Sequence, residues 1–476
     1  MKTFGWCLAA LQVLSACSPT ASSAAPTATH IEVIELAAAT EDAGSAPAFA
    51  SGDLDKDLAR SQYSLDVRLH YGEHRIQVQQ QILYLNQSAE ILDEVVLAVE
   101  GHRVGGLFEL QSLHLNGTLI AQQQPGADQF SVQLPEPLNA GDVLAIELNW
   151  SLVLSAVRAP LGYSARQAHF VDWYPFVPPR RDGGWLLPAA GAAGEHLAYE
   201  SADFMVSITV EDGDEMVVAA PGEIAPGHYM LQNARRFVWS VSPDYVLTEG
   251  EQDGIPIRIY SDAQYREAAA VALEAAQQAL AIYPPLYGPY PHSGLSFVAA
   301  EFPDGMEADE LFFLDTAYFA GYAGDPISFL PMLTAHEVAH NWWYGLVGND
   351  PANEPWLDEA LAIYSEVLYY ESLNAALVES WWAFRVEQWD PRGAVNSSIY
   401  AHNGFRPYVN AIYLRGAQFI QGLRDLIGDD AFFTFLRDYG QTYAGQLVSA
   451  DDFFDLLAEH SDADLQPLLN DYFQEP

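Results

Sequence analysis

The sequence predicts an α+β protein, with a β-rich N-terminal domain over residues 58–248 followed by a mainly α-helical domain over residues 249–476. From Tyr63 onward, apolar and polar residues alternate with a period of two, which is typical of strands with one buried face. Near Ala263 the period becomes helical, and the segment is rich in alanine. Because the period changes between these two segments, we place the domain boundary at about residue 248.

The β-rich domain is predicted from short apolar runs separated by turns. Tyr63, Leu65, Val67 and Leu69 share one face of the first strand, and turn residues at 71–73 end it. Similar runs occupy residues 76–84, 95–99, 130–134, 143–148, 205–210 and 237–241. This spacing favours an antiparallel domain whose strands are connected by turns.

The second domain is predicted to open with a helix that runs through Ala281. We expect it to end before Pro284-Pro285, because proline removes a helical hydrogen bond and crowds the preceding turn. A strand-like apolar run follows at 295–300, and the rest of the domain has mainly helical periodicity.

The composition is that of a globular protein with an acidic surface. The chain has 476 residues, 64 acidic and 20 basic side chains, and a formal net charge of −44. Such a charge repels phosphate backbones, which excludes nucleic acid as a partner. With 50% apolar and 12% aromatic residues, the chain is too apolar for a disordered acidic segment. The oligomeric state is left open.

The N-terminal residues have the pattern of an export signal. Met1 and Lys2 precede a mostly apolar stretch at 4–14 that is too short to span a bilayer as a mature helix. The tetrad Leu14-Ser15-Ala16-Cys17 resembles the bacterial lipoprotein box, in which the cysteine becomes the lipidated first residue. We therefore expect a signal peptide over 1–16 and a lipid anchor on Cys17 that tethers the protein to a membrane. A cleaved signal with an incidental cysteine is the alternative.

Residues 17–57 have the composition of a flexible linker, rich in Ala, Ser, Thr and Pro. No later stretch approaches about 18 uninterrupted apolar residues. These features predict a folded body outside the cytoplasm, held to the cell membrane through its N-terminus.

The segment His336-Glu337-Val338-Ala339-His340 has the spacing of a zinc-binding helix. Phe329, Leu333, His336 and His340 recur at helical offsets, so one face of a helix carries both imidazoles. Two imidazoles at positions i and i+4 can bind one zinc ion. A zinc site also needs a third protein ligand.

Glu359 is the candidate for that ligand. Eighteen residues separate it from His340, and a second helix is predicted to begin at Pro355. The apolar stripe of that helix would bury the Glu359 carboxylate, which is costly unless a cation meets it. Two histidines and one glutamate leave a fourth position for water, as in a catalytic zinc site. The sequence thus predicts one zinc ion per chain, bound by His336, His340 and Glu359.

These motifs resemble the signature of the aminopeptidase N family of gluzincin metallopeptidases, which also includes the leukotriene hydrolases. The shared features are the two-histidine motif, the eighteen-residue gap and the segment Trp356-Leu357-Asp358-Glu359-Ala360. Gly305-Met306-Glu307 resembles the family's Gly-x-Met-Glu-Asn motif, and Tyr413-Leu414-Arg415-Gly416-Ala417 resembles the segment of its catalytic tyrosine. Tyr287-Gly288-Pro289-Tyr290-Pro291 is similar to a turn that the family places before its strand. The resemblance spans about residues 60–476 and implies a saddle-like β domain followed by a thermolysin-like catalytic domain.

The residue types, together with this resemblance, suggest a mechanism for peptide hydrolysis. Zinc lowers the pKa of its bound water, and Glu337, next to a ligand on the same helix, can act as the general base. The resemblance implies that Tyr413 stabilises the oxyanion. A packing role is the alternative for this residue, because the chain has 25 tyrosines.

The resemblance also implies a substrate-binding segment made by Gly305, Met306 and Glu307. In the family, the edge strand lines the substrate groove, so a carboxylate at the end of the 295–300 strand can pair with the α-amine of a peptide. Solvated surface is the alternative for Glu307, and Asp309 or Glu310 could replace it in part.

Several further residues are candidates for supporting roles. Asn341, Asp358 and Glu366 could orient the zinc ligands. Gln167 is a weak candidate for amine recognition from the β domain. The segments Trp173-Tyr174-Pro175 and Asp182-Gly183-Gly184-Trp185 could reach the cleft or pack inside the domain.

The sequence departs from the family at two points. Ala308 stands where the family usually has asparagine, which removes a polar group from the amine-recognition loop. The sequence also ends about 60 residues after Tyr413, so no large helical C-terminal domain is expected and the cleft could be more open. The favoured function is a lipid-tethered zinc aminopeptidase that acts on peptides. An endopeptidase of the same fold and a non-catalytic peptide-binding lipoprotein are the alternatives.

Overall fold

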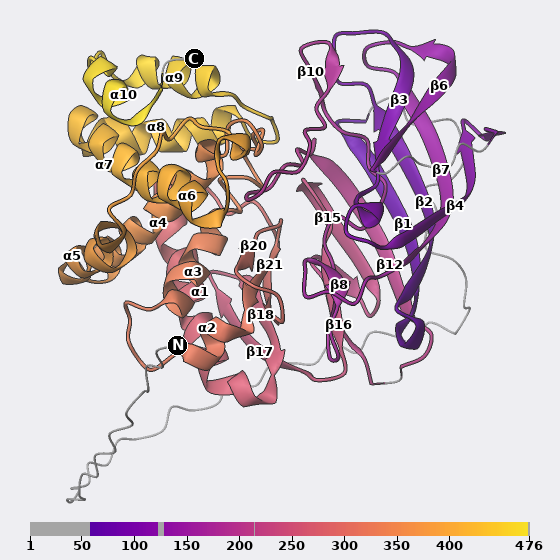
Figure 1. Cartoon of the computed structure of the whole chain (residues 1–476), viewed down its shortest axis with the longest axis horizontal. Coiled ribbons are helices and arrows are strands. Elements are labelled where there is room, and N and C mark those ends of the chain that lie inside the picture. The colour runs from indigo at the N-terminus through magenta and orange to yellow at the C-terminus, as the bar shows by residue number, and fades with distance from the viewer. Residues whose placement is uncertain (1–57, 122–127, 214, 475–476) are drawn as a thin grey trace, which may run out of the picture. The chain divides into compact units, whose positions relative to one another are not determined.

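The computed structural model describes residues 58–121, 128–213 and 215–474, which belong to one compact unit (Figure 1). The predicted signal peptide, the linker over 17–57 and Cys17 lie outside the described residues. None of the helices in the described part of the chain is long and apolar enough to cross a membrane.

The N-terminal part is built on a large sheet with the strand order β14-β15-β12-β1-β2-β7-β4-β5. Strand β1 (Ser61–His70) pairs antiparallel with β2 (Arg75–Leu85) and parallel with β12 (Ala202–Val210). In β1, Tyr63, Leu65, Val67 and Leu69 are buried and the residues between them are not, which confirms the predicted alternation. The other strands of this sheet are β4 (Leu107–Leu115), β5 (Thr118–Leu119), β7 (Val143–Val153), β14 (Glu223–Ala225) and β15 (His228–Ala234).

Smaller sheets complete the β domain and cover its apolar core. Phe170 and Trp239 stack at 3.8 Å between ring centroids inside this core. Trp173 and Tyr174 are also buried there, so the packing role foreseen for this segment is the observed one. The strands of the smaller sheets are β3 (Leu92–Ala98) with β6 (Gln129–Leu138), β10 (Arg180–Arg181) with β11 (Gly184–Trp185), and β13 (Val217–Ala219), β16 (Trp239–Ser242), β9 (Ala168–Phe170) and β8 (Leu161–Tyr163).

The helical part opens with a sheet in the order β17-β18-β19-β21-β20. Only its strand at 295–300 was predicted from the sequence. The strands are β17 (Tyr245–Gln252), β18 (Ile255–Asp262), β19 (Leu295–Ala300), β20 (Gly305–Met306) and β21 (Leu311–Asp315). The expectation that the 295–300 strand is the edge is wrong, because β19 pairs with β18 on one side and β21 on the other. The edges of this sheet are β17 and β20, and β20 turns back to pair antiparallel with β21. Position 248 lies within β17, and the domain boundary stays a prediction.

Helix α1 (Arg266–Tyr287) is longer than predicted, since it continues through Pro284 and Pro285. The φ angle of proline fits a helix, and tertiary contacts hold the last turn. The Tyr283 hydroxyl donates to the carbonyl oxygens of Ala335 and Ser365, at 3.1 Å each. The helix ends at Gly288, whose φ of 106° leaves the helical region.

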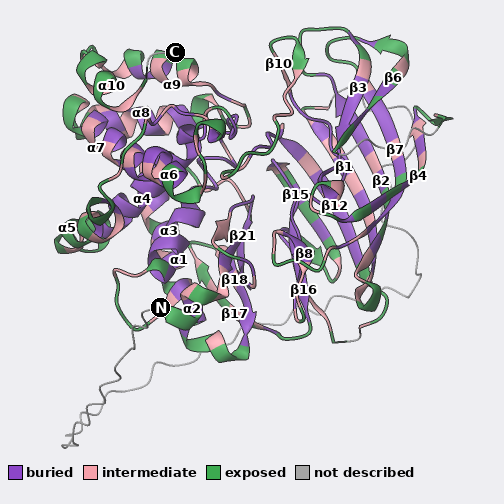
Figure 2. Cartoon of the chain, in the orientation of Figure 1, coloured by how far each residue is buried: buried purple, intermediate pink, exposed green. Residues whose placement is uncertain are grey.

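The remaining helices pack around a second apolar core, and the burial pattern separates their inner and outer faces (Figure 2). Helix α3 (Phe329–Ala339) is buried over nearly its whole length, as are the first four turns of α4 (Trp356–Asn374). Packing in the centre of this domain holds the two helices in place, and these helices carry the candidate zinc ligands. The other helices are α2 (Thr316–Gly321), α5 (Ala376–Trp381), α6 (Phe405–Val409), α7 (Arg415–Ile427), α8 (Asp429–Thr442), α9 (Ala450–His460) and α10 (Gln466–Tyr472).

Candidate metal centre and active site

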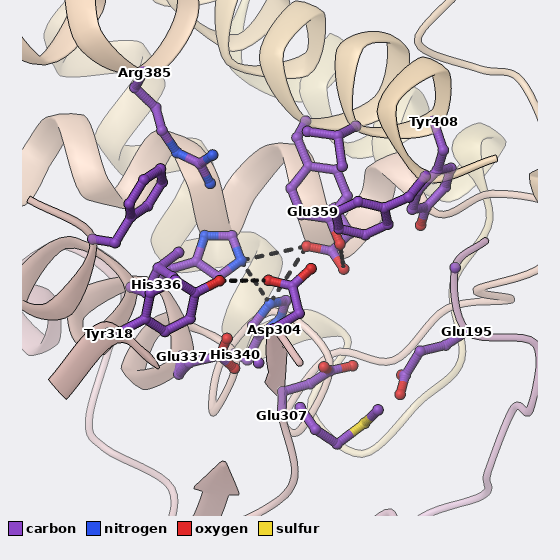
Figure 3. Close-up of a pocket in the computed structure, with 18 of the residues that line it drawn as sticks. Glu195, Asp304, Glu307, Tyr318, His336, Glu337, His340, Glu359, Arg385 and Tyr408 are labelled. Carbon is purple, nitrogen blue, oxygen red and sulfur yellow. Dashed lines mark hydrogen bonds and ion pairs between the residues drawn. The ribbon is translucent and has the colours of Figure 1, made fainter. Parts of the chain in front are cut away.

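His336 and His340 meet at the C-terminal end of α3 (Figure 3). His336 lies within the helix, and His340 follows its last residue with helical backbone angles of −62° and −16°. The i and i+4 relationship therefore persists, and the two Nε2 atoms lie 3.2 Å apart. Both side chains are buried.

Glu359 reaches the same point from the first turn of α4. Its Oε2 atom lies 3.4 Å from Nε2 of His336 and 3.5 Å from Nε2 of His340. The ligand atoms of these three residues all lie within 4.8 Å of one another, so the structure brings the predicted triad together.

The contacts of the two imidazoles indicate that a cation belongs between them. Nδ1 of His340 forms a 2.9 Å hydrogen bond with the carbonyl oxygen of Trp343, and Nδ1 of His336 makes an ion-pair contact of 3.0 Å with Oε1 of Glu366. These oxygen atoms favour a proton on each Nδ1, so both Nε2 lone pairs face the carboxylate of Glu359. Glu359 Oε2 is also buried without a hydrogen-bond donor. Three converging electron-pair donors of this kind fit a zinc ion.

Of the three residues predicted to orient the ligands, only Glu366 contacts an imidazole. Burial alone would raise its pKa, but Arg385 and His336 outweigh burial and lower it. Arg385 donates to both Glu366 oxygens at 3.2 Å, and the Trp381 indole donates at 2.9 Å. Glu366 therefore stays ionised beside His336.

The other two candidates have different partners. Asp358 accepts a hydrogen bond from the backbone N–H of Glu359 at 2.8 Å. Asn341 donates to the carbonyl oxygen of Val338 and accepts from the backbone N–H of Glu310. The partner of His340 is a backbone carbonyl, which no residue-type argument could identify.

Glu337 lies beside the triad and lines the same cavity. Burial raises its pKa to about 7, although His340 and His336 oppose the shift. A Cβ atom at Gly305 would lie 2.3 Å from Oε1 of Glu337, so only glycine lets β20 pass this close to the carboxylate. Gly305 thus makes room for Glu337.

Tyr413 lies in a π-helical turn, Asn410–Leu414, immediately before α7. Its hydroxyl donates a hydrogen bond to Oε1 of Glu359, and its ring lies nearly parallel to that of His336 at 6.1 Å. Burial and the neighbouring Glu359 raise the pKa of Tyr413 well above its ordinary value, so it keeps its proton. The structure thus brings Tyr413 into the site rather than into a packing role elsewhere.

Glu307 follows β20 and lies near Glu195, a residue that the sequence analysis missed (Figure 3). Their carboxyl groups are close enough to influence each other's pKa, and both line the cavity of the triad. Burial raises the pKa of both, that of Glu195 well above its ordinary range, while Arg236 opposes the shift in each. Two facing carboxyl groups at this position form an acidic end of the cavity.

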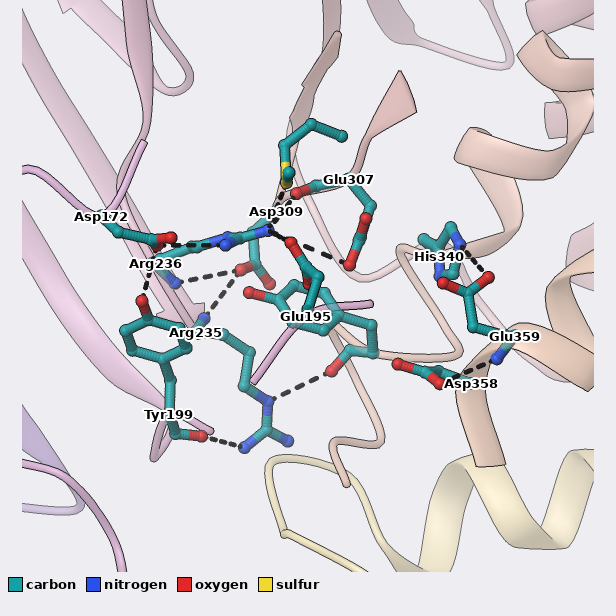
Figure 4. A network of polar contacts seen from close by, with 12 residues as sticks. Asp172, Glu195, Tyr199, Arg235, Arg236, Glu307, Asp309, His340, Asp358 and Glu359 are labelled. Carbon is teal, nitrogen blue, oxygen red and sulfur yellow. Dashed lines mark hydrogen bonds and ion pairs between the residues drawn. The ribbon is translucent and has the colours of Figure 1, made fainter. Parts of the chain in front are cut away.

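Arg236, from the β domain, holds this acidic end in place (Figure 4). Its guanidinium donates to the carbonyl oxygen of Glu307 at 2.6 Å, to Oε1 of Glu195 at 3.1 Å and to Oδ1 of Asp172 at 3.1 Å. It also lies 3.3 Å from the Met306 sulfur. In the sequence, the adjacent pair Arg235-Arg236 could have pointed to a role for Arg236, because only 20 basic residues occur in the chain. Glu195 follows Gly194 in a segment of small residues, and no sequence motif marked it as a site residue.

The residues proposed to replace Glu307 point elsewhere. Oδ2 of Asp309 accepts from the backbone N–H groups of Arg235 and Arg236, and Oε1 of Glu310 accepts from that of Gly222. Ala308 packs in an apolar cluster between the sheets. Gln167 is fully buried, and its side chain bonds the backbone of Ala299 and Glu301. Amine recognition by Gln167 is therefore not supported.

The cavity that joins these groups has a volume of about 420 Å³. It contains the triad, the Glu337 carboxylate and the Tyr413 hydroxyl, with Glu307 and Glu195 at one end. A metal site, a base, a phenol donor and an acidic end are the groups needed to hydrolyse an amide next to a cation.

Comparison with known proteins agrees with this chemistry. Residues 271–472 match the model of the peptidase family M1 domain. Aminopeptidase B of Homo sapiens is 29% identical over 191 residues, which cover 37% of this chain and 29% of that protein. Aminopeptidase N of Lactobacillus delbrueckii subsp. lactis is 23% identical over 275 residues, which cover 52% of this chain and 32% of that protein. The match thus spans about a third or less of the length of these relatives.

Solved structures share the two-domain fold. The M1 zinc metallopeptidase from Deinococcus radiodurans superposes with a TM-score of 0.64 at 20% identity, covering 87% of this chain and 94% of that one. A variant of it bound to a Tyr-Ser-Ala substrate gives a TM-score of 0.61 at 20% identity, covering 86% and 92%. These comparisons confirm the predicted order of a β-rich domain followed by a helical domain, and the predicted zinc cofactor agrees with the match to peptidase family M1. Residues 271–472 therefore match the domain of peptidase family M1, the family that the motifs of this region predicted.

Proposed function

We propose that this protein is a zinc-dependent aminopeptidase that removes N-terminal residues from peptides. The observation that carries the proposal is the pair of carboxyl groups, Glu307 and Glu195, at one end of the cavity that holds the ligand triad. A peptide ammonium at this end would offset the mutual repulsion of the two carboxylates. The distance from there to the metal site would then select the first peptide bond.

The remaining residues have matching roles. A zinc ion bound by His336, His340 and Glu359 would supply a Lewis acid and a water of lowered pKa. The Glu337 carboxylate would act as the general base for an attacking water and would return the proton to the leaving amine. The Tyr413 hydroxyl donates a hydrogen bond to the oxygen that gains negative charge as the peptide carbonyl is attacked.

The decisive experiment compares matched free and N-acetylated peptides on wild type and on Glu307→Ala. Acetylation removes the ammonium, so the wild type should cleave only the free peptide efficiently. Glu307→Ala should lower kcat/KM for the free peptide by one to a few orders of magnitude, roughly 1.5–4 kcal/mol, and narrow the gap to the acetylated one. The wild type could instead cleave both peptides equally or cut mainly inside long peptides. Either result would contradict the aminopeptidase proposal and favour an endopeptidase of the same fold.

Zinc analysis separates catalysis from mere peptide binding. His336→Ala and Glu359→Ala should lose zinc, whereas Glu337→Gln should keep it and lose turnover by about 10²- to 10⁴-fold. Full turnover in Glu337→Gln would end this mechanism, and a zinc-loaded wild type with no turnover on any peptide would favour the non-catalytic binder.

We further propose that the protein is a lipoprotein located outside the cytoplasm and anchored to the cell membrane through Cys17. The support is the sequence Leu14-Ser15-Ala16-Cys17 after an apolar stretch. Metabolic labelling with a fatty-acid probe should mark the wild type but not Cys17→Ser. An unlabelled wild type would reject the anchor.

A further inference from the structure

The cavity is also lined by exposed aromatic side chains that the proposed chemistry does not use. Among the described residues, the exposed Phe and Trp side chains are Phe329, Trp389 and Phe405, which are 40%, 42% and 51% exposed. All three line the cavity of the ligand triad. Exposed aromatic surface gathered at one cavity marks a binding surface rather than a random scatter of apolar residues.

These rings continue inward as a packed apolar wall. The Phe329 ring lies 5.7 Å from that of Tyr318 and 5.3 Å from that of Phe384. Leu333 lies one turn after Phe329 on α3 and three residues before His336, and it lines the same cavity. We call the residues of this packed stretch the aromatic wall: Tyr318, Phe329, Leu333 and Phe384.

Tyr318, against which the Phe329 ring packs, and the acidic end lie on opposite sides of the ligands (Figure 3). In Figure 3, Tyr318 and Arg385 lie beyond His336, whereas Glu195 and Glu307 lie on the side of His340 and Glu359 away from Tyr318. A peptide with its ammonium at Glu307 therefore places one residue before the metal site. The next residue passes the ligands and reaches the aromatic wall.

Charged groups also line this cavity. The Asp304 carboxyl accepts a hydrogen bond from the Tyr318 hydroxyl at 3.1 Å. The Arg385 guanidinium donates to Glu366, and the Arg406 guanidinium lies over the Trp389 ring at 4.1 Å from its centroid. Because both signs of charge are present, the apolar contact alone is the basis for selectivity.

We propose that the aromatic wall binds the side chain of the residue that follows the cleaved bond, so that peptides with an aromatic or large aliphatic second residue are preferred. This inference rests on the proposed aminopeptidase function, which sets the direction of the peptide. Burial of a phenylalanine side chain against these rings supplies the selectivity, because it removes apolar area on both partners from water.

The test uses leucyl dipeptide amides that differ only in the second residue: phenylalanine or alanine. The wild type should show kcat/KM about 10- to 100-fold higher for Leu-Phe-amide than for Leu-Ala-amide. Phe329→Ala and Phe384→Ala should reduce this Phe-to-Ala ratio several-fold, because cleavage of Leu-Phe-amide loses more apolar contact than cleavage of Leu-Ala-amide. Phe329→Leu should restore part of the ratio. Leu426→Ala, which removes a 44% exposed side chain of α7 outside the cavity lining, is the matched control and should keep the wild-type ratio.

A binding measurement separates failure of this inference from failure of the proposed function. Calorimetry with zinc-loaded Glu337→Gln should show Leu-Phe-amide binding about tenfold or more tightly than Leu-Ala-amide. Equal kcat/KM for the two amides would overturn the inference and leave the aminopeptidase intact. If Leu-Phe-amide and Leu-Ala-amide bind Glu337→Gln equally tightly, the inference is overturned whether or not the wild type is active. Absence of cleavage of every amide by the wild type would instead count against the proposed function.

Discussion

Arg236 donates a 2.6 Å hydrogen bond to the main-chain carbonyl oxygen of Glu307, although 71 positions separate the two residues in the sequence. The same guanidinium nitrogen bonds the Glu195 carboxylate. The β domain thus fixes the segment that carries the proposed amine-binding carboxyl, and it adds a second carboxyl of its own. One buried cation thus connects domain packing with the proposed site of substrate recognition (Figure 4).

Arg236→Met should therefore affect both stability and activity. Its side chain is only 3% exposed, and its loss leaves buried carboxyl groups without their cation. We expect the free energy of unfolding to fall by about 3–5 kcal/mol and kcat/KM for unblocked peptides to fall with it. Urea denaturation and steady-state kinetics measure the two effects. Arg258→Met, which breaks more exposed pairs with Glu223 and Glu249, should cost less than about 1 kcal/mol. Equal losses in the two variants would contradict this role.

Gly305→Ala should impair catalysis without removing the metal. The added Cβ would lie 2.3 Å from Oε1 of Glu337, so the general base must move. A displacement of about 1 Å can lower kcat on the order of 100-fold. Zinc content, measured by atomic absorption, should stay at one per chain. Gly321→Ala, where a Cβ meets nothing within 4 Å, is the control, and similar kinetics for both variants would refute the steric argument.

Glu366→Gln should weaken metal binding although Glu366 is not a ligand. Its carboxylate lies 3.0 Å from Nδ1 of His336 and makes that imidazole a better electron donor. We expect zinc affinity, measured by competition with a chelator, to fall about 10- to 100-fold. Glu371→Gln on the same helix removes a half-exposed partner of Arg424 and should leave the affinity unchanged. An unaltered affinity in Glu366→Gln would mean that the contact does not tune His336.

Glu310 should make the stability of the protein depend on pH. Burial raises its pKa from 4.5 to about 7, although the backbone N–H of Gly222 opposes the shift. Because the folded-state pKa is the higher one, the stabilisation is complete below about pH 4.5 and is lost as the pH rises through 7. Between pH 4.5 and 8, the wild type should lose on the order of 3 kcal/mol relative to Glu310→Gln. Denaturation curves across this range measure the difference, with exposed Glu249→Gln as the control. A parallel pH dependence of wild type and Glu310→Gln would show that this carboxyl does not titrate as described.

Local patterns in the sequence determined the elements and the metal ligands of this protein. The i and i+4 spacing of His336 and His340 predicts a shared helix face, and the alternation from Tyr63 to Leu69 predicts the buried face of β1. Glu359 could be predicted because a carboxylate on an apolar helix face needs a cation. Such inferences succeed because they depend on the repeat of a single helix or strand.

The tertiary structure decided which residues surround the ligands. Sheet order makes β20, rather than β19, an edge strand, and packing against Ala335 and Ser365 carries α1 through two prolines. Glu195 reaches the cavity from the β domain, and the partner of His340 is a backbone carbonyl. These contacts join segments far apart in the chain, so they follow from strand register and domain packing, which no local periodicity encodes.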